Sequence, residues 1–424
     1  MNIMVIGSGA REHAMVWALK KDSEVSKIIC VPGNAGISKI AKCIKRDITN
    51  IPELYNIAKY EGIDLTIVGP ELPLSLGVVN FFNERGMQIF GPCKEVAQLE
   101  SSKCFSKSFM QRHNIPTSDF KQFEDLIEAK NYIKFIKSTY VVKADGLASG
   151  KGVFICHNEF DGIDAINKIM VYKNFGENVG KKIVIEDFLK GKEVSLMVVT
   201  DGSSIKLLET SVDYKALRIN NNVLNTGGMG AYSPSETMNR ELSNNILRNI
   251  VIPTLDNIYL ETGRKYKGIL YLGLMIDGEG MPFVLEYNVR LGDPETQALL
   301  VRLESSFLKL CLATINENLN EVDILWKNTP SICIVAASKG YPDRYEKNKE
   351  IFGLQTCEDQ YQSVEIFHGG TIFGEEGKIL TEGGRVLSIV SIGDSINSAK
   401  QLAYEAIKSI YFDGMFYIEN IGTI

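Results

Sequence analysis

Residues 3–12 read IMVIGSGARE and give the clearest indication of the fold. Its four apolar residues predict a buried strand, its glycines predict a tight turn, and residues 13–19 predict a helix. Apolar runs closed by glycine turns recur at residues 28–31, 65–68 and 88–90. Because this rhythm builds right-handed βαβ units, we predict a parallel sheet. Ligands of such sheets bind at the carboxyl ends of the strands, where all four turns fall.

The first glycine turn matches a dinucleotide-binding fingerprint only in part. Glu12 stands where the third glycine belongs, and the second strand ends in Val31-Pro32, without the acid that holds a ribose 2′-hydroxyl. Both features disfavour a Rossmann-type oxidoreductase that uses NAD or FAD. The turn still points backbone N–H groups at an anion such as a sugar phosphate. A turn that binds nothing is the alternative, and a second glycine loop at residues 32–36 favours a site.

Residues 143–152, KADGLASGKG, predict a glycine loop between two strands. A P-loop is excluded, because Asp145 replaces the first Walker glycine, Gly152 replaces the Ser or Thr, and a strand follows instead of a helix. Such a loop can fold over triphosphate oxygens as a lid, with Lys143 and Lys151 as point charges. The alternative is an exposed hairpin tip with incidental lysines.

The sharpest pattern is EYNVR at residues 286–290. Because side chains alternate between the faces of an extended chain, Glu286, Asn288 and Arg290 project together. A carboxylate, an amide oxygen and a guanidinium side by side suit Mg²⁺ together with an anion, since Mg²⁺ prefers hard oxygen ligands. A solvated strand face with a surface ion pair is the alternative interpretation.

Two further patterns place acids beside predicted turns. Asp293 and Pro294 predict a helix start, with Asp293 as N-cap and Pro294 at the first helical position. Glu186 and Glu193 lie on either side of a predicted hairpin turn and can hold adenine and ribose by hydrogen bonds, although acids flank many turns. The glycine-rich segment 225–234 predicts a long functional loop.

Composition narrows the class of protein. The 424 residues contain 46 Lys and Arg against 52 Asp and Glu, a net charge of −6, which argues against general binding to nucleic acid or a membrane surface. No apolar run approaches the roughly 18 residues of a membrane span, and no signal peptide is expected. The eight cysteines show no Cys-x-x-Cys spacing and the four histidines are scattered. We therefore expect a cytoplasmic protein whose metal, if any, has oxygen ligands.

Taken together, these strings resemble the phosphoribosylamine–glycine ligases (glycinamide ribonucleotide synthetases), a family of ATP-grasp enzymes in purine synthesis. The resemblance rests on residues 7–13, 32–36, 69–71, 143–152, 225–234, 286–290, 292–297, 368–371 and 383–386. It implies an α/β and α+β multidomain fold. A Rossmann-like N-terminal domain would span residues 1–102, an ATP-grasp body 103–325 with a hinged lid at about 120–192, and a small C-terminal α/β domain 326–424.

The resemblance also implies a reaction: ATP-dependent ligation of glycine to 5-phospho-β-D-ribosylamine through glycyl phosphate, which gives glycinamide ribonucleotide, ADP and phosphate. Its cofactors would be ATP and Mg²⁺ or Mn²⁺, and its partners small-molecule substrates, with neither nucleic acid nor membrane. No covalent protein nucleophile is needed, which agrees with the absence of a Ser/His or Cys/His constellation from the sequence. We expect a monomeric, stand-alone enzyme.

Site residues follow from the resemblance position by position. ATP is expected at nine residues, namely Lys103, Lys143, Gly146, Gly150, Lys151, Gly152, Glu186, Leu189 and Glu193. The metal is expected at Glu286 and Asn288. The glycine and the transferring phosphoryl group are expected at Asp213, Lys215 and Arg290. The ribosylamine phosphate and sugar are expected at Gly9, Arg11, Asn34, Gly36, Pro70, Glu71 and Asp293.

Three positions depart from the family pattern. Tyr214 stands where the family usually has His, Ser306 replaces a common acid, and residues 421–424 lack the usual Trp-Arg ending. None of these changes removes a group that the reaction requires. Two alternatives stay open, a carboxylate–amine ligase with another acid or acceptor and a non-catalytic nucleotide-binding protein.

Overall fold

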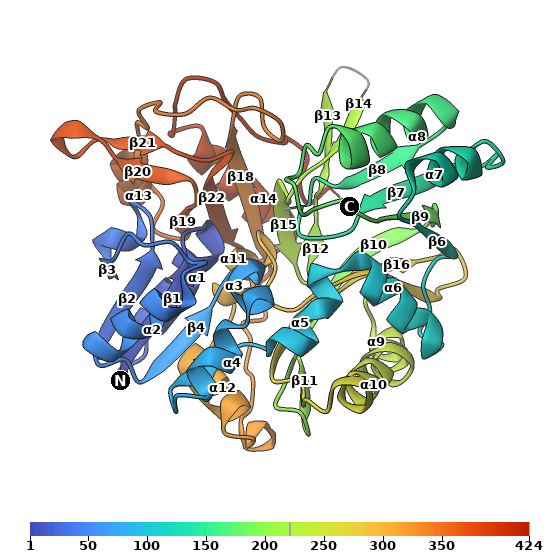
Figure 1. Cartoon of the computed structure of the whole chain (residues 1–424). Coiled ribbons are helices and arrows are strands. Elements are labelled where there is room, and N and C mark those ends of the chain that lie inside the picture. The colour runs from blue at the N-terminus through green and yellow to red at the C-terminus, as the bar shows by residue number, and fades with distance from the viewer. Residues whose placement is uncertain (149, 220–221, 424) are drawn as a thin grey trace.

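A computed structural model describes residues 1–148, 150–219 and 222–423. The N-terminal part is a parallel sheet in the order β3-β2-β1-β4-β5, as predicted (Figure 1). Its strands are β1 (Asn2–Gly7), β2 (Lys27–Pro32), β3 (Lys42–Cys43), β4 (Leu65–Val68) and β5 (Gln88–Phe90). Its helices are α1 (Ala10–Lys20), α2 (Ile51–Tyr60), α3 (Glu71–Leu76), α4 (Val78–Asn83) and α5 (Lys94–Ser101).

The next sheet is antiparallel, in the order β6-β9-β7-β8, and we call it the lid sheet. It comprises β6 (Phe120–Phe123), β7 (Tyr140–Ala144), β8 (Val153–Cys156) and β9 (Ile183–Asp187), with α6 (Lys103–Arg112) before it and α7 (Leu126–Ile133) and α8 (Glu159–Ile166) on it. A π-helical turn, Asn167–Val171, follows α8. Buried residues of α7, α8 and the strands form a hydrophobic cluster of their own.

The third sheet, in the order β11-β10-β16-β17, is the body sheet. It comprises β10 (Lys192–Thr200), β11 (Ile205–Leu207), β16 (Gly268–Ile276) and β17 (Pro282–Asn288). The predicted hairpin between residues 183 and 199 is wrong, because β9 pairs within the lid sheet and β10 within the body sheet. The turn at Lys190 and Gly191 therefore links two sheets. Helix α9 (Arg240–Ile246), a π-helical turn (Leu247–Val251) and α10 (Ile252–Thr262) follow one another along the chain.

The last large sheet combines distant parts of the chain. Strands β12 (Val212–Asp213) and β15 (Gly230–Ser233) join β18 (Ser331–Ser338), β22 (Arg385–Ile392), β19 (Val364–His368) and β23 (Met415–Phe416). Two hairpins, β13 (Ala216–Ile219) with β14 (Asn222–Asn225) and β20 (Thr371–Phe373) with β21 (Ile379–Thr381), lie outside it. The remaining helices are α11 (Glu295–Leu300), α12 (Phe307–Ile315), α13 (Leu354–Gln360) and α14 (Ile396–Ile407), with 3₁₀ turns at Ile37–Lys39, Leu319–Glu321 and Glu375–Gly377.

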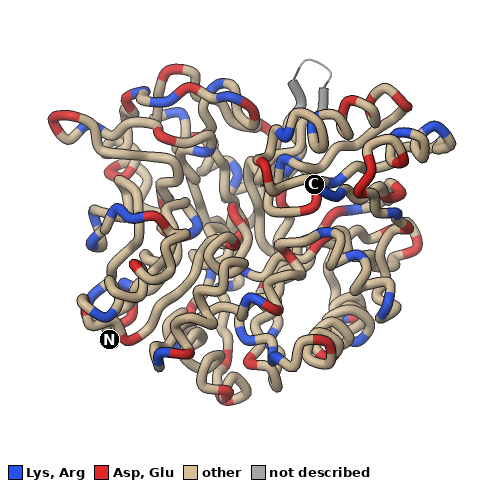
Figure 2. The backbone as a smooth tube through the Cα atoms, in the orientation of Figure 1, with Lys and Arg blue, Asp and Glu red and all other residues tan. Residues whose placement is uncertain are grey.

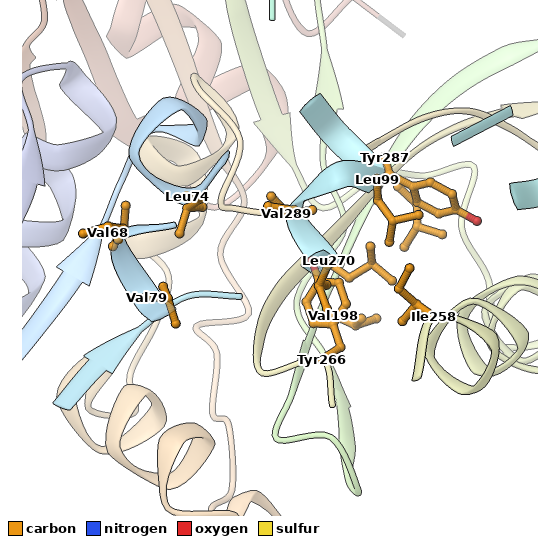
Figure 3. Packing of buried hydrophobic residues seen from close by; sticks show 14 of the residues in the cluster. Val68, Leu74, Val79, Leu99, Val198, Ile258, Tyr266, Leu270, Tyr287 and Val289 are labelled. Carbon is orange, nitrogen blue, oxygen red and sulfur yellow. The ribbon is translucent and has the colours of Figure 1, made fainter. Parts of the chain in front are cut away.

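One hydrophobic cluster spans the N-terminal part and the body sheet. Figure 3 shows Val68 and Val79 on one side of it, Leu270 and Tyr287 on the other, and Leu99 of α5 beside Tyr287. Continuous apolar packing of this kind fixes the two parts relative to each other. Figure 2 shows charges of both signs interspersed over the view. No helix in the described part of the chain is long and apolar enough to cross a membrane.

Candidate functional site

Three neighbouring cavities run between the sheets. The central cavity is lined by residues of α6, β7, β12, β17 and the loop after β17, including Lys103, Lys143, Asp213, Lys215, Glu286, Asn288 and Arg290. The lid cavity shares Lys143, Lys215 and Glu286 with it and adds Leu189 and Glu193. The N-terminal cavity shares Asp293 and Arg385 with the central cavity and adds Gly9 and Asn34. Because neighbouring cavities share lining residues, the central cavity lies next to each of the other two.

The predicted face of β17 is confirmed by the geometry. Glu286, Asn288 and Arg290 all line the central cavity, and Arg290 Nη2 donates to Asn288 Oδ1 at 3.3 Å. Val289 is buried in the hydrophobic cluster, and the Tyr287 hydroxyl bonds to the Thr254 hydroxyl at 2.7 Å. Alternation along the extended chain thus turns the polar side chains to the cavity, while Tyr287 and Val289 pack in the core and only parts of Leu285 and Tyr287 reach the cavity wall.

Lysines surround the Glu286 carboxylate. Lys215 Nζ lies 3.3 Å from Glu286 Oε1 and 3.2 Å from Glu193 Oε1. Burial raises the pKa of Glu286, but the positive charges of Lys215, Lys103 and Lys143 outweigh burial and lower this pKa to about 2. Glu286 therefore stays ionised at neutral pH and presents an anionic oxygen to the cavity.

The donor set at the end of β17 fits a hard divalent cation. Glu286 supplies carboxylate oxygens and Asn288 an amide oxygen, and both line the cavity. The described residues contain no group of three or more His, Cys, Asp or Glu side chains placed to hold a metal ion. A cation here would complete its shell with water and phosphate oxygens, which is the usual arrangement for Mg²⁺.

A second ion cluster holds Lys143. Glu186 Oε1 lies 2.5 Å from Lys143 Nζ, and Glu186 Oε2 lies 2.6 Å from Lys107 Nζ. Lys143 Nζ also donates to the Leu285 carbonyl oxygen at 3.0 Å. Burial lowers the pKa of Lys107 to about 8, although the charge of Glu186 opposes this shift. Sequence analysis singled out Lys143 and Glu186 but missed Lys107, which no local pattern distinguishes from other helix lysines.

Arg290 is held by two carboxylates from the N-terminal part. Its Nη2 lies 2.8 Å from Glu100 Oε1, and its Nε lies 3.3 Å from Glu71 Oε2. Glu100 Oε2 accepts a hydrogen bond from the Val289 backbone N–H at 2.7 Å. Glu100 was not predicted, because its partners are about 190 positions away in the sequence. Glu100 therefore joins α5 to Val289 and Arg290, the residues that follow β17.

Replacing Glu100 with Gln is expected to flatten the pH dependence of stability. Burial raises the pKa of Glu100 to about 7, against the opposing charge of Arg290. Since this value exceeds the unfolded value of about 4.3, the folded state binds the proton more tightly, and this stabilisation is lost as the pH rises from about 4 toward 7. Thermal melts between pH 5 and 8 should show a larger fall in Tm for the wild type than for Glu100→Gln.

The matched control for that experiment is Glu95→Gln on the same helix. A hydrogen bond from Asn80 lowers the pKa of Glu95, so its titration lies below the tested range. The Tm of this variant should fall between pH 5 and 8 by as much as the Tm of the wild type. Parallel plots of Tm against pH for Glu100→Gln and the wild type would contradict the prediction.

The first glycine turn is filled by Glu12. Its carboxylate is buried, accepts the Gly9 backbone N–H at 2.6 Å and pairs with Arg11 Nε at 2.6 Å. A Cβ atom at Gly69 would lie 2.1 Å from Glu12 Oε1, so only glycine fits beside this carboxylate. The Gly9 N–H is therefore bonded within the turn and does not point at an anion as the sequence predicted, and the acid disfavours a dinucleotide pyrophosphate at this turn.

The residues predicted for the sugar phosphate lie in different places. Gly9 and Asn34 line the N-terminal cavity, Arg11, Pro70 and Glu71 line the central cavity, Asp293 lines both, and Gly36 lines none of the three. Asn34 Nδ2 donates to the carbonyl oxygens of Ser8 and His368 at 2.8 and 2.6 Å. Its amide therefore ties the N-terminal part to β19.

Asp293 is not the N-cap that the sequence predicted. Helix α11 begins at Glu295 with Pro294 at the N-cap position. The Asp293 carboxylate instead accepts hydrogen bonds from Gln297 Nε2 at 2.6 Å and from Arg385 Nη2 at 3.1 Å. Arg385 comes from β22, too far along the chain for local pattern analysis to connect it with Asp293.

The glycine loop lies against the central cavity, which Gly150 and Gly152 line. Lys103 Nζ donates to the Gly146 carbonyl oxygen at 3.4 Å, and Lys151 Nζ lies 5.5 Å from the centre of the Tyr341 ring. Ser149, which belongs to this loop, and Ile424, at the atypical C-terminus, lie outside the described residues.

Tyr214, the main departure from the family pattern, points away from the site. It is absent from the residues lining the three cavities, whereas its neighbours Asp213 and Lys215 line the central one. The Tyr214 hydroxyl accepts the Gly422 backbone N–H at 3.1 Å, and its ring packs in the core of the C-terminal sheet. Alternation of side chains along residues 213–215, where β12 ends, therefore keeps this substitution out of the site.

A lid sheet with a glycine loop faces a body strand that carries a carboxylate, an amide and a guanidinium, and this arrangement defines an ATP-grasp enzyme. Family models described as the N, ATP-grasp (A) and C domains of phosphoribosylglycinamide synthetase match residues 1–100, 101–296 and 331–424. The chain belongs to the phosphoribosylglycinamide synthetase family.

Individual relatives agree with these matches. The chain is 44% identical to the phosphoribosylamine–glycine ligase of Vibrio vulnificus (strain CMCP6), over 100% of this chain and 98% of that protein. It is 42% identical to the enzyme of the same name from Caldanaerobacter subterraneus subsp. tengcongensis, over the full length of both. The crystal structure of phosphoribosylamine–glycine ligase from Thermotoga maritima superposes with a TM-score of 0.83 at 33% identity, covering 99% of this chain and 100% of that one.

Proposed function

We propose that this protein joins glycine to 5-phospho-β-D-ribosylamine at the expense of ATP, through glycyl phosphate. The observation that carries the proposal is the convergence of Glu286, Asn288 and Arg290 with Lys103 and Lys143 on one cavity beside the glycine loop. A carboxylate does not react with an amine until a better leaving group replaces its oxygen. Transfer of the γ-phosphoryl group to glycine supplies that leaving group, and the ribosylamine nitrogen then displaces phosphate.

Neither step needs a covalent protein intermediate, so positioning and charge neutralisation carry the catalysis. In our proposal Lys103 and Lys143 hold the ATP phosphates, and Glu186 fixes Lys143 in place. Arg290 and Lys215 neutralise the charge that develops on the transferring phosphoryl group. Closure of the lid sheet excludes water, which would otherwise hydrolyse the acyl phosphate.

Glu286 and Asn288 are the proposed ligands of Mg²⁺ or Mn²⁺. When bound, the cation neutralises phosphate oxygens and orients them for in-line transfer. The low pKa of Glu286 keeps this ligand deprotonated at neutral pH. Lys215 Nζ lies 3.3 Å from Glu286 Oε1 and is therefore close enough to help neutralise the negative charge of the phosphates.

The lid cavity and the N-terminal cavity flank the central cavity and can hold the parts of the two larger substrates that do not react. We assign adenine and ribose of ATP to the lid cavity, beside Leu189 and Glu193, and the phosphoribosyl group to the N-terminal cavity, beside Gly9 and Asn34.

Phosphate release from ATP tests the proposal. We expect release only when glycine and freshly prepared phosphoribosylamine are both present, because the acyl phosphate is trapped in a closed site until the amine arrives. Release that is indifferent to glycine would instead indicate a carboxylate–amine ligase acting on another acid. An absence of ATP turnover with every acid and amine pair would contradict the proposed class of reaction.

A further inference from the structure

Helix α6 carries a second lysine, Lys107, that the proposed reaction does not use. Lys107 comes four residues after Lys103, so both side chains leave the same face of the helix, and both line the central cavity. Lys103 is half-buried, whereas Lys107 is only 2% exposed. A buried ammonium group is costly unless acceptors surround it, so the partners of Lys107 indicate its role.

The contacts of Lys107 leave it no donor for a nucleotide. Its Nζ atom donates to Thr117 Oγ1 at 2.6 Å and to Ser118 Oγ at 2.8 Å, and it lies 2.6 Å from Glu186 Oε2. An ammonium group has three N–H donors, and these three oxygens account for them. Lys107 therefore does not bind a phosphate while these contacts persist, although it borders the cavity.

Lys143, in contrast, keeps a donor for the cavity. The register between β7 and β9 pairs Val141 with Glu186, which places Glu186 diagonally across from Lys143 on the same face of the lid sheet. Lys143 Nζ lies 2.5 Å from Glu186 Oε1 and donates to the Leu285 carbonyl oxygen at 3.0 Å. Among the residues that the structure describes, Lys143 has no further ion pair or hydrogen bond through Nζ, so one of its three N–H donors remains for a ligand.

The three side chains together carry one net positive charge. Burial raises the pKa of Glu186, but the charges of Lys143 and Lys107 outweigh burial and lower this pKa, so Glu186 is ionised at neutral pH. Lys107 is charged as well, because burial lowers its pKa only to about 8. Without Lys107, the other two side chains would form a neutral pair, and the carboxylate would compete with the phosphates for Lys143. Lys107 therefore leaves the charge of Lys143 available to the cavity.

We propose that Lys107 is a positioning residue for the binding of the ATP phosphates, and that it acts through Glu186 and Lys143 without touching the nucleotide. By holding Glu186 Oε2 it fixes the carboxylate, and it leaves one N–H donor and the charge of Lys143 for a phosphate oxygen. This inference rests on the proposed function and adds a residue to its phosphate site. Helix α6 then supplies one lysine that binds phosphate directly, Lys103, and one that positions another lysine.

The main test is the affinity of Lys107→Met for a non-hydrolysable ATP analogue with Mg²⁺, measured by isothermal titration calorimetry. We expect the Kd to rise roughly tenfold, as for the loss of a charge-assisted hydrogen bond, whereas the Kd for adenosine, which has no phosphate, should stay within about twofold. The fold should persist, since Glu186 keeps its ion pair with Lys143 and no buried charge is left without a partner. Lys107→Gln, which can still donate to the two hydroxyls, should show the same loss.

A second substitution separates this role from a purely structural one. Glu186→Gln removes the carboxylate that Lys107 neutralises, so adding Lys107→Met to Glu186→Gln should change the Kd for the analogue by less than about threefold. A lysine that only supported packing would weaken binding by the same factor in both backgrounds. Equal losses in the two backgrounds would therefore overturn the proposal.

Arg112→Met is the matched control, because Arg112 lies on the same helix and pairs with a carboxylate, that of Glu261 at 2.8 Å, but lines none of the three cavities. It should leave the Kd for the analogue unchanged. If Lys107→Met and Lys107→Gln bind the analogue as tightly as the wild type does, the positioning role is wrong and the proposed function stands. A wild type that binds no ATP analogue would overturn the proposed function itself.

Discussion

Replacing Glu286 with Gln is expected to lower kcat by roughly 10²-fold or more, because the neutral amide binds a divalent cation poorly and no longer helps to neutralise the transferring phosphoryl group. The change keeps the size of the side chain and its hydrogen bond with Lys215. Steady-state phosphate release at saturating ATP, glycine and ribosylamine measures the effect. Raising the Mg²⁺ concentration should restore part of the lost rate.

Glu317→Gln is a matched control for this experiment. Hydrogen bonds from Lys267 and Lys265 lower the pKa of Glu317 to about 2, similar to that of Glu286, but Glu317 lines none of the three cavities. We expect it to keep normal turnover. Near-normal turnover by Glu286→Gln would place the metal site elsewhere.

Replacing Lys143 with Ala is expected to lower kcat/KM for ATP by roughly 10- to 100-fold, the loss of a charge-assisted hydrogen bond to phosphate. The fold should persist, because Glu186 keeps its ion pair with Lys107 at 2.6 Å. Initial rates over a range of ATP concentrations measure the effect, and circular dichroism checks the fold.

Lys182→Ala supplies the comparison for Lys143. Lys182 directly precedes β9 of the lid sheet, as Lys143 lies in β7 of the same sheet, but Lys182 pairs with Glu124 at 2.5 Å on the surface and lines none of the three cavities. Its removal should leave the KM for ATP unchanged. Equal effects of the two substitutions would mean that Lys143 acts through lid stability and not through phosphate binding.

Properties that are set by neighbouring residues in the chain could be predicted from the sequence. The glycine turns mark the ends of parallel strands because an apolar run must be buried and must then reverse. The face shared by Glu286, Asn288 and Arg290 follows from the geometry of an extended chain, whatever surrounds it. The same alternation explains why Tyr214 leaves the site while Asp213 and Lys215 enter it.

Properties that depend on a partner far along the chain could not be predicted from the sequence. Two strands joined by a short turn predict a hairpin, but β9 and β10 each find a better partner in a different sheet. Asp293 has the local pattern of an N-cap, but Arg385 and Gln297 hold its carboxylate. Glu100 has no local signature, since only its tertiary contacts with Val289 and Arg290 give it its surroundings.

The proposed metal and phosphate site is tested most directly by a crystal structure with a non-hydrolysable ATP analogue, Mn²⁺ and glycine. We predict an anomalous Mn²⁺ peak within about 2.3 Å of oxygens of Glu286 and Asn288, in contact with the terminal phosphates. The glycine loop should close over the same phosphates. A nucleotide whose phosphates lie away from Glu286 and Lys143, with Mn²⁺ bound elsewhere, would contradict it.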